Sequence, residues 1–236
     1  MKGKYTSNVF FLLTFILKYL IMVHNLSEQA SILGQYLAEI RDVNIQKDPI
    51  RFRMNLERIA EVLGYEVSKQ MKYKEIDVES PLGLSQEFQL IDAPILITIL
   101  RAGLAMHNGL LRTFDRSDSA FVSAYRQHTT PEQFKIHVEY LAAPNLDKQV
   151  WIISDPMLAT GSSMVNVYKA LLKFGKPKKI YVLVSIATPQ AIELVEKELP
   201  SGTEIWTGAI DSELTAESYI VPGLGDAGDL AYGVKV

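Results

Sequence analysis

Residues 150–165 contain the side chains that point most directly to chemistry. An apolar run at 150–153 is followed by Asp155, then by Thr160 and Gly161, and then by a helical pattern. This order predicts a strand, a polar loop and a helix N-terminus, which seats phosphate through unpaired N–H groups and partial positive charge. A carboxylate beside it could hold hydroxyls or a metal. The stretch indicates a phosphorylated sugar or nucleotide as ligand, although an ordinary strand–turn–helix is an equally good explanation.

A second candidate is Arg101, which follows the apolar run 95–100 and precedes Ala102 and Gly103. An arginine at a strand end can hold phosphate through two hydrogen bonds, while small neighbours let the backbone approach the ligand. Taken alone, a structural salt bridge explains Arg101 more simply.

The third candidate is the tail 219–233, with the sequence Y-I-V-P-G-L-G-D-A-G-D-L-A-Y-G. Its closely spaced glycines Gly223, Gly225 and Gly228 indicate a backbone held near a ligand. A flexible tail is the alternative, but apolar residues within the segment favour packing.

The elements that position these segments alternate between strand and helix, which predicts right-handed crossovers and a parallel sheet. Ligands bind at the carboxyl ends of such strands, so Arg101, Asp155 and Asp211 are expected on one rim. A polar stretch at 76–93 is expected to be an extended arm, and Asp48-Pro49 and Thr188-Pro189 to begin helices. Strands are expected at 95–100, 120–124, 134–141, 150–153, 180–186 and 205–210, and helices at 27–41, 49–67, 104–114, 163–174 and 189–199.

Composition excludes several classes of site. The 236 residues are 48% hydrophobic and 22% charged, which suits one globular domain. A net charge of −3 gives no reason to expect a nucleic-acid partner. The chain has no cysteine, which rules out disulfides and thiolate sites and fits a reducing compartment, so we expect a cytoplasmic location. Its four histidines lack zinc-binding spacing.

Residues 1–21 form a hydrophobic N-terminal extension. It is short for a membrane span, and no cleavage site for a signal peptide follows it. We favour a start codon assigned too early, with Met22 as the true first residue. An expressed tail and a membrane-tethered variant are the alternatives, and no membrane partner is expected.

Together the motifs D-P-M-L-A-T-G-S-S, I-L-R-A-G-L and Y-I-V-P-G-L-G-D-A-G-D resemble the uracil phosphoribosyltransferase family. The resemblance runs from about residue 26 to the C-terminus, and R-D-V-N and V-E-S-P-L-G also fit it. It implies the α/β type I phosphoribosyltransferase fold: a Rossmann-like parallel sheet flanked by helices, with a small hood and an extended β-arm. Residues 22–236 would form this single domain.

The resemblance implies an enzyme of pyrimidine salvage. It would transfer the phosphoribosyl group of phosphoribosyl pyrophosphate (PRPP) to N1 of uracil, giving UMP and diphosphate. Mg²⁺ would be the cofactor, held through substrate and water near Asp226 rather than directly by the protein. The arm at 78–90 would make a homodimer or a higher homo-oligomer, and GTP, which activates some relatives, is a possible effector.

The resemblance also implies roles for individual residues. Asp226 and Arg101 would be catalytic. The PRPP site would comprise Arg101, Arg126, Asp155, Pro156, Met157, Leu158, Ala159, Thr160, Gly161, Ser162, Ser163 and Asp226. The uracil site would comprise Ile220, Gly225, Asp226 and Ala227, acting largely through the backbone.

The sequence departs from the family pattern at three positions. Ser162 replaces a usual glycine, Thr98 a usual proline, and Leu230 a common basic residue. These departures bear on affinity and regulation more than on the reaction. A phosphoribosyltransferase-fold regulatory protein that binds RNA without this activity is the alternative function, and another base specificity is the alternative among enzymes.

Overall fold

A seven-stranded sheet forms the centre of the computed structural model, which describes residues 22–130 and 133–235, with the side chains of 124–138 outside the description. Its strand order is β1-β9-β8-β7-β4-β5-β6, and all neighbours are parallel except β5 and β6. This arrangement confirms the predicted α/β fold. The strands are β1 (Met22–Asn25), β4 (Ile95–Leu100), β5 (Ser119–Thr130), β6 (Gln133–Ala142), β7 (Val150–Leu158), β8 (Lys179–Ala187) and β9 (Glu204–Ile210).

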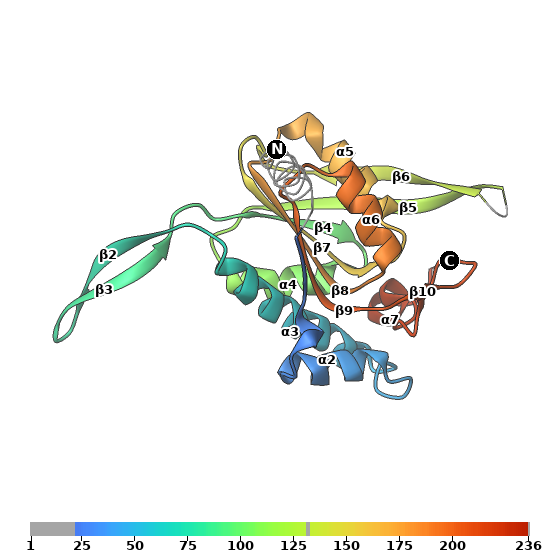
Figure 1. Ribbon diagram of the computed structural model, residues 1–236, viewed down its shortest axis with the longest axis horizontal. Helices are drawn as coiled ribbons and strands as arrows, with labels where there is room; N and C mark the ends of the chain where they lie inside the picture. The colour runs from blue at the N-terminus through green and yellow to red at the C-terminus, as the bar shows by residue number, and fades with distance from the viewer. Residues whose placement is uncertain (1–21, 131–132, 236) are drawn as a thin grey trace, which may run out of the picture.

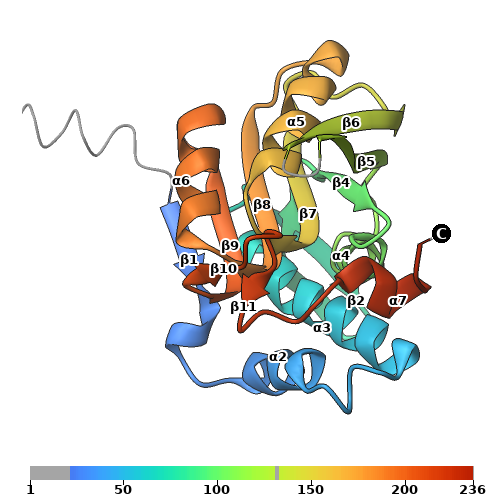
Figure 2. The ribbon, with the colours of Figure 1, turned by 90° about the vertical axis from the view of Figure 1, so that its right-hand side faces the viewer.

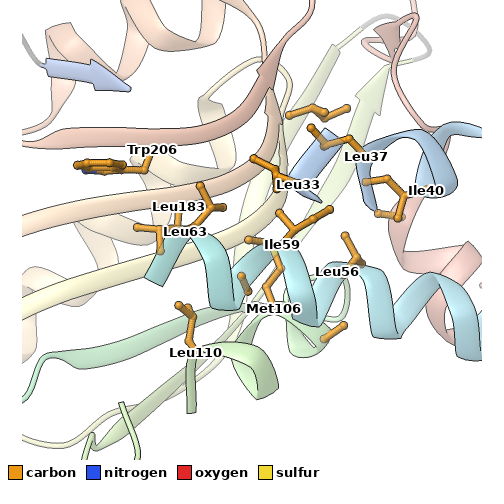
Figure 3. Close-up of a cluster of buried hydrophobic side chains, with 14 of the residues drawn as sticks. Leu33, Leu37, Ile40, Leu56, Ile59, Leu63, Met106, Leu110, Leu183 and Trp206 are labelled. Atoms are coloured by element: carbon orange, nitrogen blue, oxygen red, sulfur yellow. The ribbon is translucent and has the colours of Figure 1, made fainter. Parts of the chain in front are cut away.

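Helices cover both faces of the sheet (Figures 1 and 2). One face carries α5 (Ser162–Leu171) and α6 (Pro189–Glu198), and the other carries α2 (Ile32–Arg41), α3 (Pro49–Ser68) and α4 (Leu104–Thr113). Strands buried on both faces are almost continuously apolar, which is why the runs at 95–100 and 180–186 were recognisable. Figure 3 shows one of the two cores, where Leu33, Ile59 and Leu110 of the three helices pack towards Leu183 and Trp206 of the sheet.

Two helix starts follow local capping chemistry, as predicted. Asp48 accepts hydrogen bonds from the N–H groups of Ile50 and Arg51 at 2.9 and 3.3 Å, and Pro49 opens α3. The Thr188 hydroxyl accepts from the N–H of Ala191 at 3.1 Å, and Pro189 opens α6. Each cap satisfies N–H groups that have no partner inside the helix.

The N-terminal part of the described chain differs from the prediction. A short 3-10 helix (Leu26–Glu28) precedes α2, which begins at Ile32 because Ser31 has an extended backbone. The unpredicted strand β1 pairs with β9. The ring of His24 stacks on Trp206 at 3.7 Å between centroids, and its Nε2 lies 3.2 Å from Glu204 Oε2. These contacts attach the start of the described chain to the sheet edge.

The predicted arm is a hairpin of β2 (Tyr73–Ser80) and β3 (Gly83–Leu90), paired in antiparallel register. It projects away from the helices and the central sheet (Figure 1). The predicted hairpin at 134–141 is also present as β5 and β6, which is longer than expected.

Two segments are more regular than predicted. β7 continues through Leu158 because it pairs with β8 along this length, so the first part of the expected phosphate loop is strand. The tail is folded, with β10 (Glu213–Leu214), β11 (Ile220–Val221) and α7 (Ala227–Tyr232), which favours the packed tail over the flexible one. A 3-10 turn (Leu172–Phe174) ends the helical segment after α5.

Residues 1–21 lie outside the described residues, so their predicted origin stays a prediction, as does the division into an extension and one domain at 22–236. Within 22–130 and 133–235, no helix is both long and apolar enough to cross a bilayer.

Candidate active site

A cavity of about 690 Å³ lies where β4 and β7 end and where the folded tail returns to the sheet. Figure 1 shows α7 beyond the carboxyl ends of the strands. Three separate segments of the chain therefore meet at one edge of the sheet. The cavity is lined by Ile99, Leu100, Arg101, Ala102, Ser123, Glu139, Asp155, Met157, Leu158, Ala159, Thr160, Gly161, Ser163, Met164, Ser218, Tyr219, Ile220, Asp226, Gly228 and Lys235.

The junction between β7 and α5 supplies one side of the cavity. Gly161 precedes α5 with a φ of +78°, and a Cβ at this position would lie 2.9 Å from the carbonyl oxygen of Ala191. Glycine is therefore needed here for both conformation and space. The hydroxyl of Thr160 accepts from the N–H of Ser162 at 3.4 Å, which supports the turn into the helix. The N-terminus of α5 thus faces the cavity from a closely packed turn.

Asp155 is part-buried on β7 and faces the same cavity. Burial raises the pKa of its carboxyl group to about 7, opposed by a hydrogen bond from the N–H of Met157 at 3.3 Å. Within the described residues, no ion pair includes Asp155. Its carboxylate can therefore accept a hydrogen bond from a ligand hydroxyl or bind a cation that accompanies the ligand.

Arg101 follows β4 and projects towards the tail. Its Nη2 donates to Asp229 Oδ1 at 3.0 Å and to the carbonyl oxygen of Gly233 at 3.2 Å, and its side chain is 42% exposed. At Gly103, a Cβ would lie 2.7 Å from the carbonyl oxygen of Ile99, so this turn also needs glycine. The guanidinium group keeps further donors for an anion in the cavity.

A buried polar network joins α4 to β4 and β5. His107 is 2% exposed, with Nδ1 2.7 Å from the hydroxyl of Thr98 and Nε2 3.1 Å from the hydroxyl of Ser119. Burial lowers the pKa of His107, so the neutral ring is favoured. Thr98, which replaces the usual proline, therefore supplies a hydrogen-bond partner that a proline could not.

The tail forms the opposite side of the cavity. Asp226 precedes α7, and its Oδ1 accepts from the N–H of Asp229 at 3.0 Å. Its Oδ2 lies 3.8 Å from Nζ of Lys235. The side chain of Ile220 is buried, whereas Tyr219 is 47% exposed. This side combines an apolar wall with a carboxylate that is partly accessible.

The structure places most of the predicted site residues around the cavity. Those that line it are Arg101, Asp155, Met157, Leu158, Ala159, Thr160, Gly161, Ser163, Ile220 and Asp226. Pro156, Ser162, Gly225 and Ala227 are neighbours of lining residues but are not among them. Arg126 lies on β5, and its side chain is outside the described part of the chain.

Some lining residues were not predicted, among them Met164, Tyr219 and Lys235. Lys235 had no sequence signal, because nothing in its neighbourhood predicts that the C-terminus returns to the cavity. Tyr219 had a weak signal as the first residue of the tail motif. Asp211 follows β9 as predicted but does not line the cavity; it pairs with Arg41 at 2.8 Å.

The carboxylates at the cavity suit a metal that is bound mainly by substrate. Among the described residues, no three His, Cys, Asp or Glu side chains gather closely enough to hold a metal ion. Mg²⁺ commonly takes one or two carboxylates together with waters and substrate phosphates. Asp155 on β7 and Asp226 in the tail are the carboxylates that could bind the metal, directly or through water.

Sequence comparison identifies related proteins along almost the whole chain. A curated uracil phosphoribosyltransferase from Porphyromonas gingivalis is 50% identical over 214 residues, which cover 91% of this chain and 99% of that protein. One from Thermococcus gammatolerans is 37% identical over 213 residues, covering 89% and 92%. A solved structure of an Aquifex aeolicus protein has a TM-score of 0.79 at 29% identity and covers 91% of this chain and all of that one.

The family profile described as uracil phosphoribosyltransferase matches residues 27–234, which include all of the cavity-lining residues except Lys235. The match extends from the 3-10 helix before α2 to the residues after α7, and the half-identical relative covers 91% of the chain. The chain therefore belongs to the uracil phosphoribosyltransferase family.

Proposed function

We propose that this protein transfers the phosphoribosyl group of PRPP to N1 of uracil, giving UMP and diphosphate in pyrimidine salvage. The observation that supports this most strongly is the meeting of the three family motifs at one cavity. They lie far apart in the sequence, at Arg101, at 155–163 and at 220–226, yet they border the same space.

The β7–α5 junction is the proposed site of the ribose 5-phosphate. Its glycine turn and the N-terminus of α5 favour a phosphate, for which helix N–H groups and partial positive charge are suited. Asp155 is placed to hold ribose hydroxyls or a hydrated cation. We assign Pro156 and Ser162 to this segment as supporting residues, because they connect lining residues without lining the cavity.

Arg101 is the proposed binding group for the diphosphate. The carbon–oxygen bond to the diphosphate breaks as N1 of uracil bonds to the same ribose carbon, and N1 gives up its proton to water or to the departing diphosphate. Negative charge grows on the leaving group. A guanidinium group stabilises that charge. The diphosphate would compete with Asp229 for Arg101, so substrate binding would change the contact between β4 and the tail. Arg126 is proposed as a second contact, from its place on β5.

Mg²⁺ is proposed as the cofactor, since it neutralises diphosphate charge when it is bound to the substrate. Asp226 is the proposed group on the tail side, acting on the hydrated metal or on the phosphoribosyl substrate. The chain's own contribution is to hold this carboxylate in place through its hydrogen bond with the N–H of Asp229.

Uracil is proposed to bind along Ile220, Gly225, Asp226 and Ala227. Uracil presents a donor between two acceptors, a pattern that fixed backbone groups can match. A site built for such a pattern rejects a base with a misplaced donor, because buried polar groups are then left unpaired. Cytosine, with an amino group at C4, would be such a base.

The arm supports the proposal that the enzyme is a homo-oligomer. Leu82, Leu84 and Phe88 are 101%, 78% and 73% exposed on a hairpin that projects from the body (Figure 1). An isolated two-stranded hairpin is marginally stable in water. A second copy that covers these side chains would stabilise it, so Phe88→Ser should shift the mass of the particle in solution towards the monomer.

Diphosphate release tests the proposed activity. Purified protein with Mg²⁺ and PRPP should release diphosphate in a uracil-dependent manner and form UMP in equal amount. Orotate, hypoxanthine and cytosine test base choice, and added GTP tests the proposed effector. No release with any base would reject the enzyme and favour the RNA-binding alternative, which retention of RNA at moderate salt would support. Cell fractionation tests the proposed cytoplasmic location.

A further inference from the structure

Arg41 and Asp211 form a two-point ion pair that borders the tail. Arg41 Nη1 lies 2.8 Å from Asp211 Oδ2, and Arg41 Nη2 lies 2.9 Å from Asp211 Oδ1. Asp211 is 6% exposed and follows β9, whereas Arg41 is the last residue of α2. Such paired, charge-assisted hydrogen bonds fix orientation as well as distance. The pair therefore joins the end of α2 to the end of β9 in one defined geometry.

The same two side chains hold the backbone of Gly223. The N–H of Gly223 donates to Asp211 Oδ2 at 3.1 Å, and the Gly223 carbonyl oxygen accepts from Arg41 Nη1 at 3.0 Å. Figure 2 shows that α2 runs beneath this part of the tail. Both backbone polar atoms of one residue are thus bound by opposite charges.

Gly223 occupies a turn that only glycine can make. Its φ is +60°, and a Cβ there would lie 2.0 Å from the carbonyl oxygen of Ile220. The turn separates Ile220 from Gly225 and Asp226, so its conformation sets the spacing between the two halves of the proposed uracil segment.

A neighbouring contact extends this support along the tail. The amide nitrogen of Gln46, Nε2, donates to the carbonyl oxygen of Arg41 at 3.0 Å, and Gln46 is 9% exposed. Its Oε1 lies 3.9 Å from the position that a Cβ on Gly225 would take. The end of α2 and the loop that follows it therefore lie next to both Gly223 and Gly225.

We propose that Arg41 and Asp211 are positioning residues that determine affinity and selectivity for the base. They do not line the cavity; they act by holding Gly223 and hence the backbone groups that would recognise uracil. The inference rests on the proposed function. Backbone recognition discriminates between bases only while the donors and acceptors stay fixed, and this tail has only two-residue strands and a six-residue helix to fix them.

Steady-state kinetics of Arg41→Lys and Asp211→Asn test the inference. Arg41→Lys keeps the charge but removes the two-point geometry, and Asp211→Asn keeps the shape but removes the charge. We expect KM for uracil to rise about tenfold or more and that for PRPP to change by less than about threefold, from the loss of charged hydrogen bonds. Competition by cytosine should become stronger relative to uracil.

Arg51→Lys is a matched control. Arg51 makes a similar two-point pair with Glu39 between α3 and α2, with Nε and Nη2 at 2.6 and 2.8 Å from the two carboxylate oxygens. This pair also involves α2, but it makes none of the hydrogen bonds to Gly223. Its loss should lower the melting temperature while the ratio of the two KM values stays at the wild-type value.

Two further measurements separate positioning from general destabilisation. Guanidinium at millimolar concentration should restore part of kcat/KM for uracil in Arg41→Ala. Hydrogen exchange should accelerate at 220–226 in Asp211→Asn and stay unchanged at 159–165. Hydrogen exchange needs no turnover, so it can also be measured on a variant with low activity.

The outcomes distinguish the two proposals. A wild-type protein without uracil-dependent release of diphosphate would reject the proposed function and this inference with it. An active wild type whose Arg41→Lys and Asp211→Asn variants raise both KM values equally, or neither, would reject the positioning role alone. Loss of folding in Asp211→Asn leaves the decision to Arg41→Lys, in which the ion pair retains both charges.

Discussion

The two sides of the cavity are held in place by different parts of the chain. The phosphoribosyl side consists of consecutive residues at the end of β7 and the start of α5, and β7 is paired with its neighbour β8 up to Leu158. The base side is a tail held by residues that are distant in the sequence. Arg41 and Asp211, which hold Gly223, are 170 positions apart.

This difference predicts how each side responds to substitution. A strand-to-helix junction keeps its geometry through backbone pairing, so a side chain there can be changed without moving its neighbours. The tail has few backbone partners and depends on side-chain ion pairs. Changes on the phosphoribosyl side should therefore affect one substrate through direct contacts, whereas changes behind the tail should affect the other through position.

The largest expected effect is that of Asp226→Asn on turnover. An asparagine can still accept the hydrogen bond from the N–H of Asp229, so the fold should remain, but the negative charge is lost. We expect kcat to fall at least about 100-fold, the size found when a group that acts on the transition state is removed. The melting temperature should remain near that of the wild type.

Asp226→Ala is the matched comparison, because it removes the cap as well as the charge. It should lower both kcat and the melting temperature. Near-normal kcat in the asparagine variant would show that the tail carboxylate takes no part in the reaction and would weaken the division between the two sides.

Arg101→Ala should give the next largest effect. Removal of the guanidinium group should raise KM for PRPP about 10- to 100-fold, since charged hydrogen bonds to phosphate are lost. KM for uracil should change much less. Arg112→Ala is a suitable control, because Arg112 of α4 pairs with Glu57 and Glu61 of α3 and does not line the cavity. Equal changes in both KM values would contradict the assignment of Arg101 to the diphosphate.

The effect of pH on PRPP binding should be smaller than the effects of Asp226→Asn and Arg101→Ala, and it should depend on Asp155. Burial raises its pKa to about 7, so the carboxyl group is mostly protonated below that pH and ionised above it. If the ionised form binds the substrate and its metal, apparent affinity should improve several-fold between about pH 6 and pH 8. Asp155→Asn should remove this dependence in a binding titration; a profile unchanged in that variant would reject the role of Asp155.

The same carboxyl group also predicts a change in stability with the opposite pH trend. Its pKa in the folded protein lies above the value of 3.8 expected in the unfolded chain. The group therefore stabilises the fold at low pH, and this contribution is lost as pH rises through about 7. Without ligand, the difference in melting temperature between wild type and Asp155→Asn should therefore decrease as the pH rises from about 4 to about 7.

The smallest effect is expected from His107, which is buried on α4 between Thr98 and Ser119. Burial lowers its pKa in the folded state, so its contribution to stability is present above the unfolded value of 6.5 and is lost as pH falls below it. His107→Gln should flatten this part of the stability profile, with a cost on the order of 1 kcal/mol above pH 7. Chemical denaturation at several pH values measures the free energy of unfolding and its pH dependence. A loss of stability below pH 6.5 that is the same in His107→Gln as in wild type would contradict the role of His107.

Many of the helix starts and buried strands could be predicted from local sequence patterns. Pro49 and Pro189, each preceded by a capping residue, marked where α3 and α6 begin. Apolar runs marked β4 and β8, because strands covered on both faces need no polar alternation. The β1 strand was missed, since four residues at a sheet edge have no period to recognise and their pairing depends on β9.

The two sides of the cavity were also predictable to different extents. Glycines at 161 and 223 could be recognised as turns because the need for positive φ is local. The direction of a charged side chain at a strand end is not local. Asp155 and Asp211 each follow an apolar run, yet one faces the cavity and the other faces Arg41.

The sequence by itself determined most strands and helices between residues 49 and 210, the turns that require glycine and the three motifs that identify the family, because each depends on residues close together in the chain. Only the tertiary structure decided that Arg101 pairs with Asp229, that Lys235 borders the cavity and that Asp211 supports Gly223. The physical reason is that a charged side chain takes its orientation from the partner that compensates its charge, and these partners come from distant parts of the chain.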